Sequence, residues 1–261
     1  MVAKICGVSK YGSPWDAYRQ LVEGYQVETT LPMKVGKALE KELLPELYRA
    51  ATPGLKLYPP QEVTLEDWAR GHLDGVGENA DGERWVVEYK TASIRTVKEW
   101  GAMEDQIPTD YLCQVQFYML LTGLRKSEVA VLLGNEDFQV RTIHFDADFA
   151  ERMEDTCKRF WVDHVLTQRP PPIDFSDACK AWLLERNPPP EERKEEMLEP
   201  TEDELEILKD WREAKKQQDQ AGQLLALCRN RIDERIGAAK GIKGVALKTT
   251  KGHIRFFGDE Q

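Results

Sequence analysis

Three side chains on two neighbouring apolar segments have the types and spacing of a hydrolytic metal site. Glu88 and Lys90 lie two residues apart in one segment, so in a β-strand both project from the same face. Placing an acid and a base on an apolar strand is costly unless the charges are paired or bind a metal. The preceding apolar segment ends near Asp74, and a hairpin turning within residues 77–82 brings Asp74 beside Glu88.

These residues predict a particular chemistry. The carboxylates of Asp74 and Glu88, with the backbone carbonyl of Tyr89, form an oxygen site suited to Mg²⁺ or Mn²⁺. A metal there holds a phosphate oxygen and lowers the pKa of a coordinated water, while Lys90 steadies the water or the phosphate. The expected reaction is in-line hydrolysis of a phosphodiester. The same spacing is also common in surface strands with salt bridges, so the interpretation depends on further residues.

The elements that must position these residues indicate a mixed α/β domain over residues 1–172. Apolar periodicity, caps and turn residues predict its helices and strands. Helices are expected over Met33–Ala50, over Asp110–Leu121 with Gly123 as its end, and from Asp146 towards Gln168. Strands are expected over Gly71–Val76, Arg84–Lys90, Glu128–Leu133 and Phe138–Phe145.

Two proline clusters separate this domain from the rest of the chain. Residues 173–200 are predicted to form a proline-rich acidic connector with a short helix around Ala178–Glu185. Residues 201–261 follow as a long helix and a small hairpin. A capping box at Thr201 starts the helix, which runs to about Ile236 with apolar spacings of four and three, typical of a helix that packs along a partner. The hairpin is expected over 245–249 and 253–257.

Charge and composition limit the function classes. The net charge of −10 opposes a role in duplex binding alone, because such binding depends on neutralising phosphates, but residues 191–206 hold nine acidic and two basic side chains. No apolar run approaches the ~20 residues of a membrane span, and no secretory signal is visible, which predicts a cytoplasmic protein without a membrane partner. Five widely spaced cysteines without a CxxC pair favour reduced structural thiols; an iron–sulfur cluster stays open.

Additional polar residues support the predicted site. Gly36-Lys37-Ala38-Leu39-Glu40 places the acid Glu40 on the helix that precedes the two strands. Gln114 and Tyr118 lie four residues apart on the helix that follows the two strands, and they therefore share one face of that helix. Together with Asp74, Glu88 and Lys90 they form an ordered series of motifs.

In this order the motifs resemble the YqaJ-type viral recombinase family, phage lambda exonuclease-like members of the PD-(D/E)XK nuclease superfamily. The family pattern reads Gly-x-x-x-Glu, Asp-Gly, Glu-x-Lys, and Tyr-x-x-Gln-x-Gln followed by an aromatic residue. The resemblance covers about residues 5–170 and rests on Gly36/Glu40, Asp74-Gly75, Glu88-Tyr89-Lys90 and Tyr111-Leu112-Cys113-Gln114-Val115-Gln116-Phe117.

The resemblance implies a PD-(D/E)XK (restriction-endonuclease-like) α/β core, with a mixed central sheet flanked by helices, over residues 1–172. It implies that Asp74 and Glu88 are metal ligands, with the carbonyl of Tyr89 as a third. It implies that Lys90 is the catalytic lysine.

It further implies that Glu40 helps a second metal or its water, that Gln114 orients the lysine or a phosphate, and that Tyr118 belongs to the same motif. Against the family pattern, the Gly-Ser-rich N-terminal segment is expected to be shortened or absent here, which leaves open how a DNA end is recognised.

The function expected from this resemblance is Mg²⁺-dependent exonuclease activity on double-stranded DNA, serving phage-type recombination by single-strand annealing. The expected partners are duplex DNA, an annealing protein and further copies in a homo-oligomer, for a phage or prophage protein in a bacterial host. The alternatives are a single-strand exonuclease, an endonuclease of the same fold, and a catalytically silent DNA-binding or scaffold protein.

Arg95, Lys98 and Trp100 follow the predicted catalytic strand. The two cations are candidates for contacts with a DNA backbone, and Trp100 for stacking on a base or a DNA end. A mobile loop with a solvated charged face is an equally good interpretation.

Overall fold

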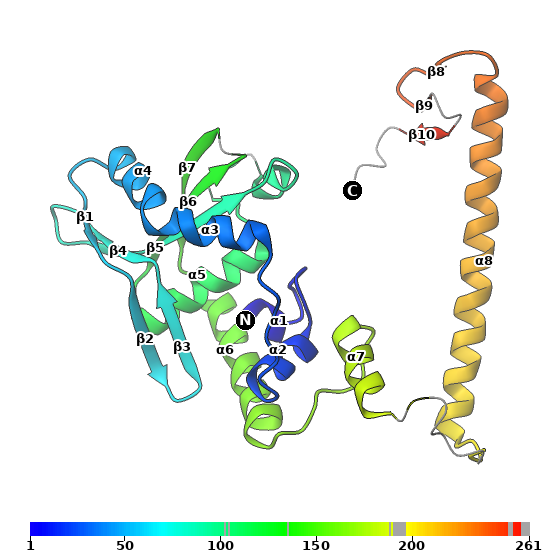
Figure 1. The fold of residues 1–261 in the computed structure, drawn as a ribbon, viewed down its shortest axis with the longest axis horizontal. Coiled ribbons are helices and arrows are strands. Elements are labelled where there is room, and N and C mark those ends of the chain that lie inside the picture. Colours follow the sequence, from blue (N-terminus) through cyan, green and yellow to red (C-terminus); the bar gives the residue numbers. More distant parts are fainter. Residues whose placement is uncertain are drawn as a thin grey trace. The chain divides into compact units, whose positions relative to one another are not determined.

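The computed structural model describes residues 1–101, 103, 105–134, 136–187, 189, 197–249 and 253–256. The chain forms two compact units, Met1–Glu191 and Glu192–Gln261. The first unit holds a mixed sheet with helices, and the second holds a long helix and a small sheet (Figure 1). The expected mixed α/β class with a C-terminal long helix is therefore confirmed. None of the described helices has the length and apolarity to cross a bilayer.

The central sheet has five strands in the order β1-β4-β5-β6-β7. Only β5 and β6 run parallel, and the other neighbours are antiparallel. Parallel neighbours need a crossover connection, and helix α5 (Thr109–Thr122) lies in the chain between them. The strands are β1 (Lys56–Tyr58), β4 (Gly75–Glu78), β5 (Arg84–Ala92), β6 (Lys126–Leu133) and β7 (Asp137–His144).

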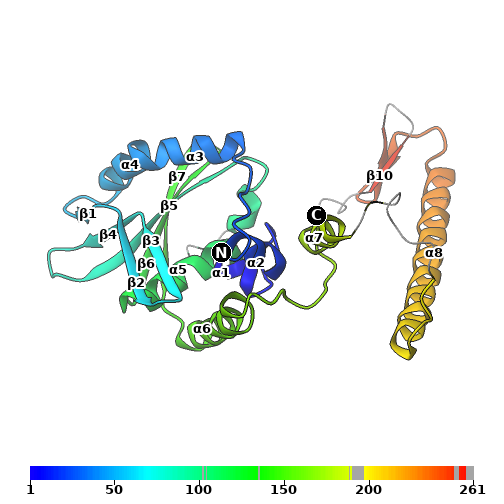
Figure 2. The same ribbon diagram turned by 60° about the horizontal axis from the view of Figure 1, so that its bottom comes forward.

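Helices cover both faces of this sheet (Figure 2). On one face, Tyr48 of α4 (Leu43–Ala51) packs with Val87 and Tyr89 of β5. On the other face, Val115 of α5 packs with Val86. The alternation of side chains along β5 is thus the one expected from its sequence. Helix α6 (Ala147–Phe160) forms a further layer that packs on α5.

The single helix predicted over Met33–Ala50 is wrong, because two helices occupy this region. Helix α3 (Leu31–Lys41) ends and α4 begins at Glu42, whose φ of −132° and ψ of −56° leave the helical region. Pro45 explains the break. In a continuous helix it would remove the hydrogen bond to the carbonyl of residue 41 and clash with that carbonyl.

The single strand predicted over Gly71–Val76 is also wrong. Strand β3 (Ala69–Leu73) pairs with β2 (Gln61–Glu66) in a two-stranded ribbon, whereas β4 pairs with β1 and β5 in the central sheet. Asp74 is the one residue between β3 and β4. The chain therefore changes sheets at the residue predicted to bind metal.

The remaining predicted elements of the first unit are present with small shifts. Helix α5 ends at Gly123, whose φ of +72° is the left-handed conformation that glycine favours. Asp146 caps α6 by accepting a hydrogen bond from the amide of Phe149. A π-helical turn, η2 (Trp161–Leu166), continues α6.

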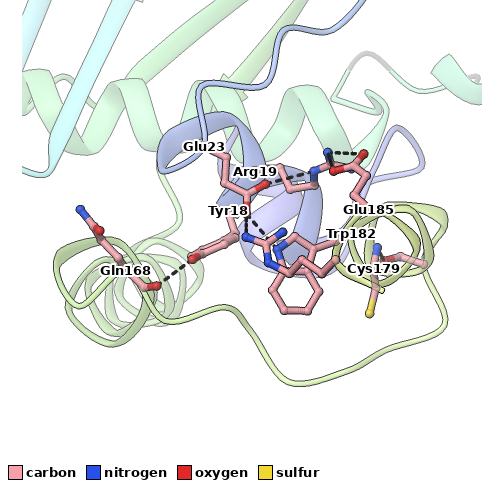
Figure 3. A network of polar contacts seen from close by, with 9 residues as sticks. Tyr18, Arg19, Glu23, Gln168, Cys179, Trp182 and Glu185 are labelled. Atoms are coloured by element: carbon pink, nitrogen blue, oxygen red, sulfur yellow. Dashed lines mark hydrogen bonds and ion pairs between the residues drawn. The ribbon is translucent and has the colours of Figure 1, made fainter. Parts of the chain in front are cut away.

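Two short helices that were not predicted, α1 (Val2–Ile5) and α2 (Pro14–Leu21), begin the chain. Helix α7 (Asp177–Arg186) packs on α2, with the rings of Trp15 and Trp182 4.7 Å apart. Arg19 of α2 bonds to Glu185 of α7 at 2.7 Å and to Glu23 at 3.3 Å (Figure 3). Residues 177–186 therefore belong to the first unit by their contacts.

In the second unit, α8 (Glu202–Ile236) begins at the predicted capping box of Thr201. The predicted hairpin is present as β9 (Ala246–Lys248) and β10 (Ile254–Phe256), and β8 (Gly241–Ile242) adds a third strand. Residues 250–252, which join the two predicted strands, lie outside the described residues. The buried core of this unit comprises Ile236, Ala246 and Ile254.

Candidate active site

Asp74 lies beside the middle of β5. Gly75 pairs with Val87 across the antiparallel β4–β5 ladder. Asp74 precedes Gly75 and Glu88 follows Val87, so the same register brings Asp74 close to Glu88. The Oδ2 atom of Asp74 accepts a hydrogen bond from the backbone amide of Tyr89 at 2.8 Å. The proximity predicted from the turn residues is therefore present, with the carboxylate of Asp74 fixed against the strand backbone.

Glu88 is the buried acid of the site, with 2% of its surface exposed. Its Oε1 atom accepts hydrogen bonds from the Nζ of Lys90 and, at 2.7 Å, from the Nε2 of Gln114. Its Oε2 atom is buried without a hydrogen-bond partner among the described residues. Glu88 and Lys90 therefore share one face of β5, as predicted, and one carboxylate oxygen remains available for a ligand.

Burial dominates the electrostatics of this pair. It raises the pKa of Glu88, and the neighbouring Lys90 opposes that rise. For Lys90, burial alone lowers the pKa, but the carboxylates of Glu88 and Asp74 raise it above its ordinary value. The ammonium group of Lys90 is thus kept charged next to two acids, and a cation bound at Glu88 would favour its ionised form.

Gln114 connects Glu88 to the aromatic ring of Tyr118. Its Nε2 atom also donates to the hydroxyl of Tyr118 at 3.0 Å, across one turn of α5. The ring of Tyr118 lies against Gly71 of β3, where an added Cβ would be 2.7 Å from a ring carbon. Sequence reasoning missed the role of Gly71, although glycine within a strand often marks such a close approach.

Tyr111 covers the charged end of Lys90, whose Nζ lies 5.1 Å from the centre of the Tyr111 ring. Tyr111 is part of the family motif, but the resemblance implies no individual role for it. Its ring also packs against that of Trp100, 5.5 Å away.

The expectation that Trp100 stacks on DNA is wrong. Only 1% of its surface is exposed, because the 3₁₀ turn η1 (Val97–Trp100) directs it into the core. Arg95 and Lys98 are exposed, and their contacts with DNA stay a prediction.

Glu40 is half-buried on α3 and interacts electrostatically with Asp74 and Lys90. Burial raises the pKa of Glu40, and the charge of Asp74 adds to the rise. Gly36 allows α3 to approach β5, since a Cβ there would lie 3.3 Å from the Oγ1 of Thr91. The glycine of the motif thus has a packing role, and the acid one turn later has an electrostatic one.

Two cavities flank these residues. A cavity of about 830 Å³ is lined by Glu40, Asp74 and Tyr89, with Lys37 and Arg49 among the cations around it. A second cavity, of about 310 Å³, lies on the side of α5. Its lining includes Tyr111, Gln114, Tyr118, Ser9 and Arg70.

The donor set fits a hard divalent cation. Asp74 and Glu88 supply carboxylate oxygens, and the Oε2 of Glu88 is a buried acceptor to which no described residue donates. Within the described ranges, no three His, Cys, Asp or Glu side chains converge closely enough to hold a metal by themselves. Glu40 is therefore not a third side-chain ligand in this arrangement, and a backbone carbonyl such as that of Tyr89, or water, must complete the shell.

The five cysteines are free thiols. Cys113 and Cys157 are buried in the apolar cluster between α5 and α6, and Cys6 packs against the same cluster. All five lie in the described part of the chain, where they form no metal-binding group. The expectation of structural thiols agrees with this packing of Cys113 and Cys157.

Sequence comparison finds similarity to a known family in the part of the chain that holds the site. Residues 1–125 match the family model of the YqaJ-like viral recombinase domain. The uncharacterized protein YqaJ of Bacillus subtilis (strain 168) is 35% identical over 107 residues, which are 40% of this chain and 33% of that relative. The chain thus covers about a third of the relative's length. The predicted resemblance is confirmed over residues 1–125, which contain every predicted site residue.

Solved structures show more distant similarity. The alkaline exonuclease LHK-Exo from Laribacter hongkongensis has 18% identity and a TM-score of 0.48, over 62% of this chain and 84% of its own. A phage-related exonuclease from Haemophilus somnus 129PT has 15% identity and a TM-score of 0.46, over 64% of this chain and 94% of its own. Neither similarity assigns an activity to this chain.

Proposed function

We propose that this protein is a metal-dependent deoxyribonuclease that degrades double-stranded DNA from an end. The observation that carries the proposal is the buried Glu88–Lys90 pair, held by Gln114 and flanked by Asp74. These residues lie together inside the segment that matches the recombinase domain. A structural salt bridge would not require a second carboxylate nearby or leave a buried acceptor oxygen without a donor.

Asp74, Glu88 and the carbonyl of Tyr89 are the groups that would hold Mg²⁺, or Mn²⁺ in its place. The bound cation supplies charge stabilisation at a phosphate oxygen and a coordinated water of lowered pKa. Lys90 places a permanent positive charge where negative charge develops during hydrolysis. Gln114 keeps Glu88 oriented, and Glu40 orients water on the α3 side.

The finer proposal is an exonuclease that resects duplex ends for recombination by single-strand annealing, in the cytoplasm of a bacterial host. It is supported by the family description of a viral recombinase domain. An annealing protein and further copies of this chain are the proposed partners. A single-strand exonuclease and an endonuclease of the same fold are the competing activities.

The test uses the full chain with linear duplex DNA and Mg²⁺. Wild-type protein should degrade the DNA, EDTA should abolish degradation, and Asp74→Ala and Lys90→Ala should each lose it. Asp81→Ala and Lys56→Ala are the matched controls, because Asp81 lies in an exposed turn and Lys56 is exposed on the edge strand β1. An inactive wild type, or equal activity in all five proteins, would contradict the proposal.

The choice of substrate separates the competing activities. An exonuclease acting on duplex ends degrades linear duplex and spares closed circular DNA of the same sequence. An endonuclease cuts both, and a single-strand exonuclease prefers heat-denatured linear DNA. Only the first pattern supports the finer proposal.

A further inference from the structure

Helix α8 carries a largely apolar stripe that the described residues of the second unit do not cover. The stripe consists of Ile207, Trp211, Ala214, Gln218, Ala221, Leu225 and Cys228, with alternating spacings of four and three residues. All seven side chains are exposed, including 61% of Trp211 and 71% of Leu225. Among the residues that the structure describes, only the C-terminal end of the helix is packed, where Ile232 and Ile236 contact the small sheet.

We propose that α8 pairs with α8 of a second copy of this chain, in antiparallel orientation. The spacing is that of a coiled-coil seam, in which side chains of one helix fill holes of another. The stripe extends over about 32 Å at 1.5 Å per residue. A helix gains most of its stability by packing an apolar face, and this stripe is long enough to do so along a second helix.

Side-chain size favours the antiparallel orientation. Trp211 and Leu225 lie towards opposite ends of the stripe, and the small residues Ala214 and Ala221 lie between them. An antiparallel pair in which Gln218 faces Ala221 of the second copy also places Trp211 opposite Cys228, and Leu225 opposite Ala214. Each of these three layers then joins a larger side chain to a smaller one, whereas a parallel pair sets Trp211 against Trp211.

Charge favours the same orientation. Residues 202–210 carry five acidic and one basic side chain, whereas residues 229–235 carry three basic and two acidic ones. Antiparallel pairing brings each acidic start near the basic end of the other helix, with Asp210 close to Arg231 of the second copy. Parallel pairing would place the two acidic starts side by side, which is repulsive.

Light scattering of the full-length protein tests the pairing. Wild-type protein should have the mass of a dimer, and Leu225→Asp should have that of a monomer. Leu227→Asp is the matched control, because Leu227 is also exposed but lies two residues further, on the far side of the helix. A monomeric wild type, or dimers of both variants, would overturn the proposal. Nuclease activity is a separate measurement, so either result leaves the proposed function to be judged independently.

Disulfide formation tests the orientation. In the antiparallel pair, Trp211→Cys faces Cys228 of the second copy, so mild oxidation should link most of the dimer. Adding Cys228→Ser should abolish the link, and oxidised wild type should stay unlinked. In a parallel pair, the wild type would crosslink through Cys228 itself, and Trp211→Cys would still crosslink after Cys228→Ser. Either of these results would overturn the antiparallel arrangement.

Discussion

The side-chain amide of Gln114 donates to the buried carboxylate of Glu88 across 2.7 Å, and so joins helix α5 to strand β5 at the candidate site. The same nitrogen donates to the hydroxyl of Tyr118. The carboxylate of Glu88 is thus oriented from the helix on one side and by Lys90 from its own strand. This arrangement makes the geometry of a buried acid depend on residues outside its strand.

Replacing Gln114 with leucine should impair catalysis more than folding. A hydrogen bond to a buried charged group contributes about 1.5–3 kcal/mol, which corresponds to a roughly 10- to 150-fold effect on the rate. The variant should also need more Mg²⁺ for half-maximal rate, because Glu88 is then less well oriented. Rates measured across a Mg²⁺ titration check this result. Gln217→Leu, exposed on α8, is the control and should keep the wild-type rate and Mg²⁺ requirement. An unchanged Mg²⁺ requirement in Gln114→Leu would contradict the positioning role.

Replacing Gly71 with alanine should destabilise the fold through the ring of Tyr118. The added methyl group would lie 2.7 Å from a ring carbon, and the hydrogen bond from Gln114 holds that ring in place. Overpacking of this kind costs about 1–3 kcal/mol in the free energy of unfolding.

Denaturant unfolding of Gly71→Ala, Tyr118→Ala and the double variant measures the coupling between the two positions. The added cost of Gly71→Ala should largely disappear when Tyr118 is already alanine. Additive effects of the two substitutions would show that the tyrosine ring is not the obstacle.

Replacing Trp182 with alanine should loosen α7 from α2. The substitution removes the ring contact with Trp15 and the hydrogen bond to Glu23. Because Trp182 is half-buried, we expect a loss of roughly 1–3 kcal/mol in the free energy of unfolding. Limited proteolysis within residues 167–176 should become faster. Leu184→Ala, on an exposed position of the same helix, should change stability by less than about 0.5 kcal/mol; equal effects of both would argue against this packing.

Thiol reactivity should separate the cysteines by burial. Cys228 is exposed, whereas Cys113 and Cys179 are buried, and burial raises the pKa of Cys113 to about 11. At pH 8 Cys113 is therefore almost wholly in the unreactive thiol form. The pairing proposed for α8 would cover Cys228, so the measurement uses the monomeric variant Leu225→Asp. There a disulfide reagent should show a fast phase that Cys228→Ser removes and Cys179→Ser leaves intact. Because Cys6 is half-buried, Cys6→Ser is added to these variants; a fast phase that persists without Cys6 and Cys228 would show that a buried thiol is accessible.

Local patterns were sufficient for much of the site. The two-residue period of a strand places Glu88 and Lys90 on one face, and the helical period places Gln114 and Tyr118 together, whatever surrounds them. The capping box of Thr201 likewise acts within a single turn. These features depend on neighbours in the chain, so the sequence by itself determined them.

Other features depended on contacts between distant segments. Only the tertiary structure showed that Asp74 lies where the chain passes from one sheet to another, because β3 and β4 pair with different strands. Only it showed that Trp100 is buried and that Gly71 accommodates the ring of Tyr118. Burial and strand pairing are set by long-range packing, which residue spacing alone does not encode. The predicted catalytic residues and Gln114 could therefore be named from the sequence, whereas the packing of Trp100 and Gly71 could not.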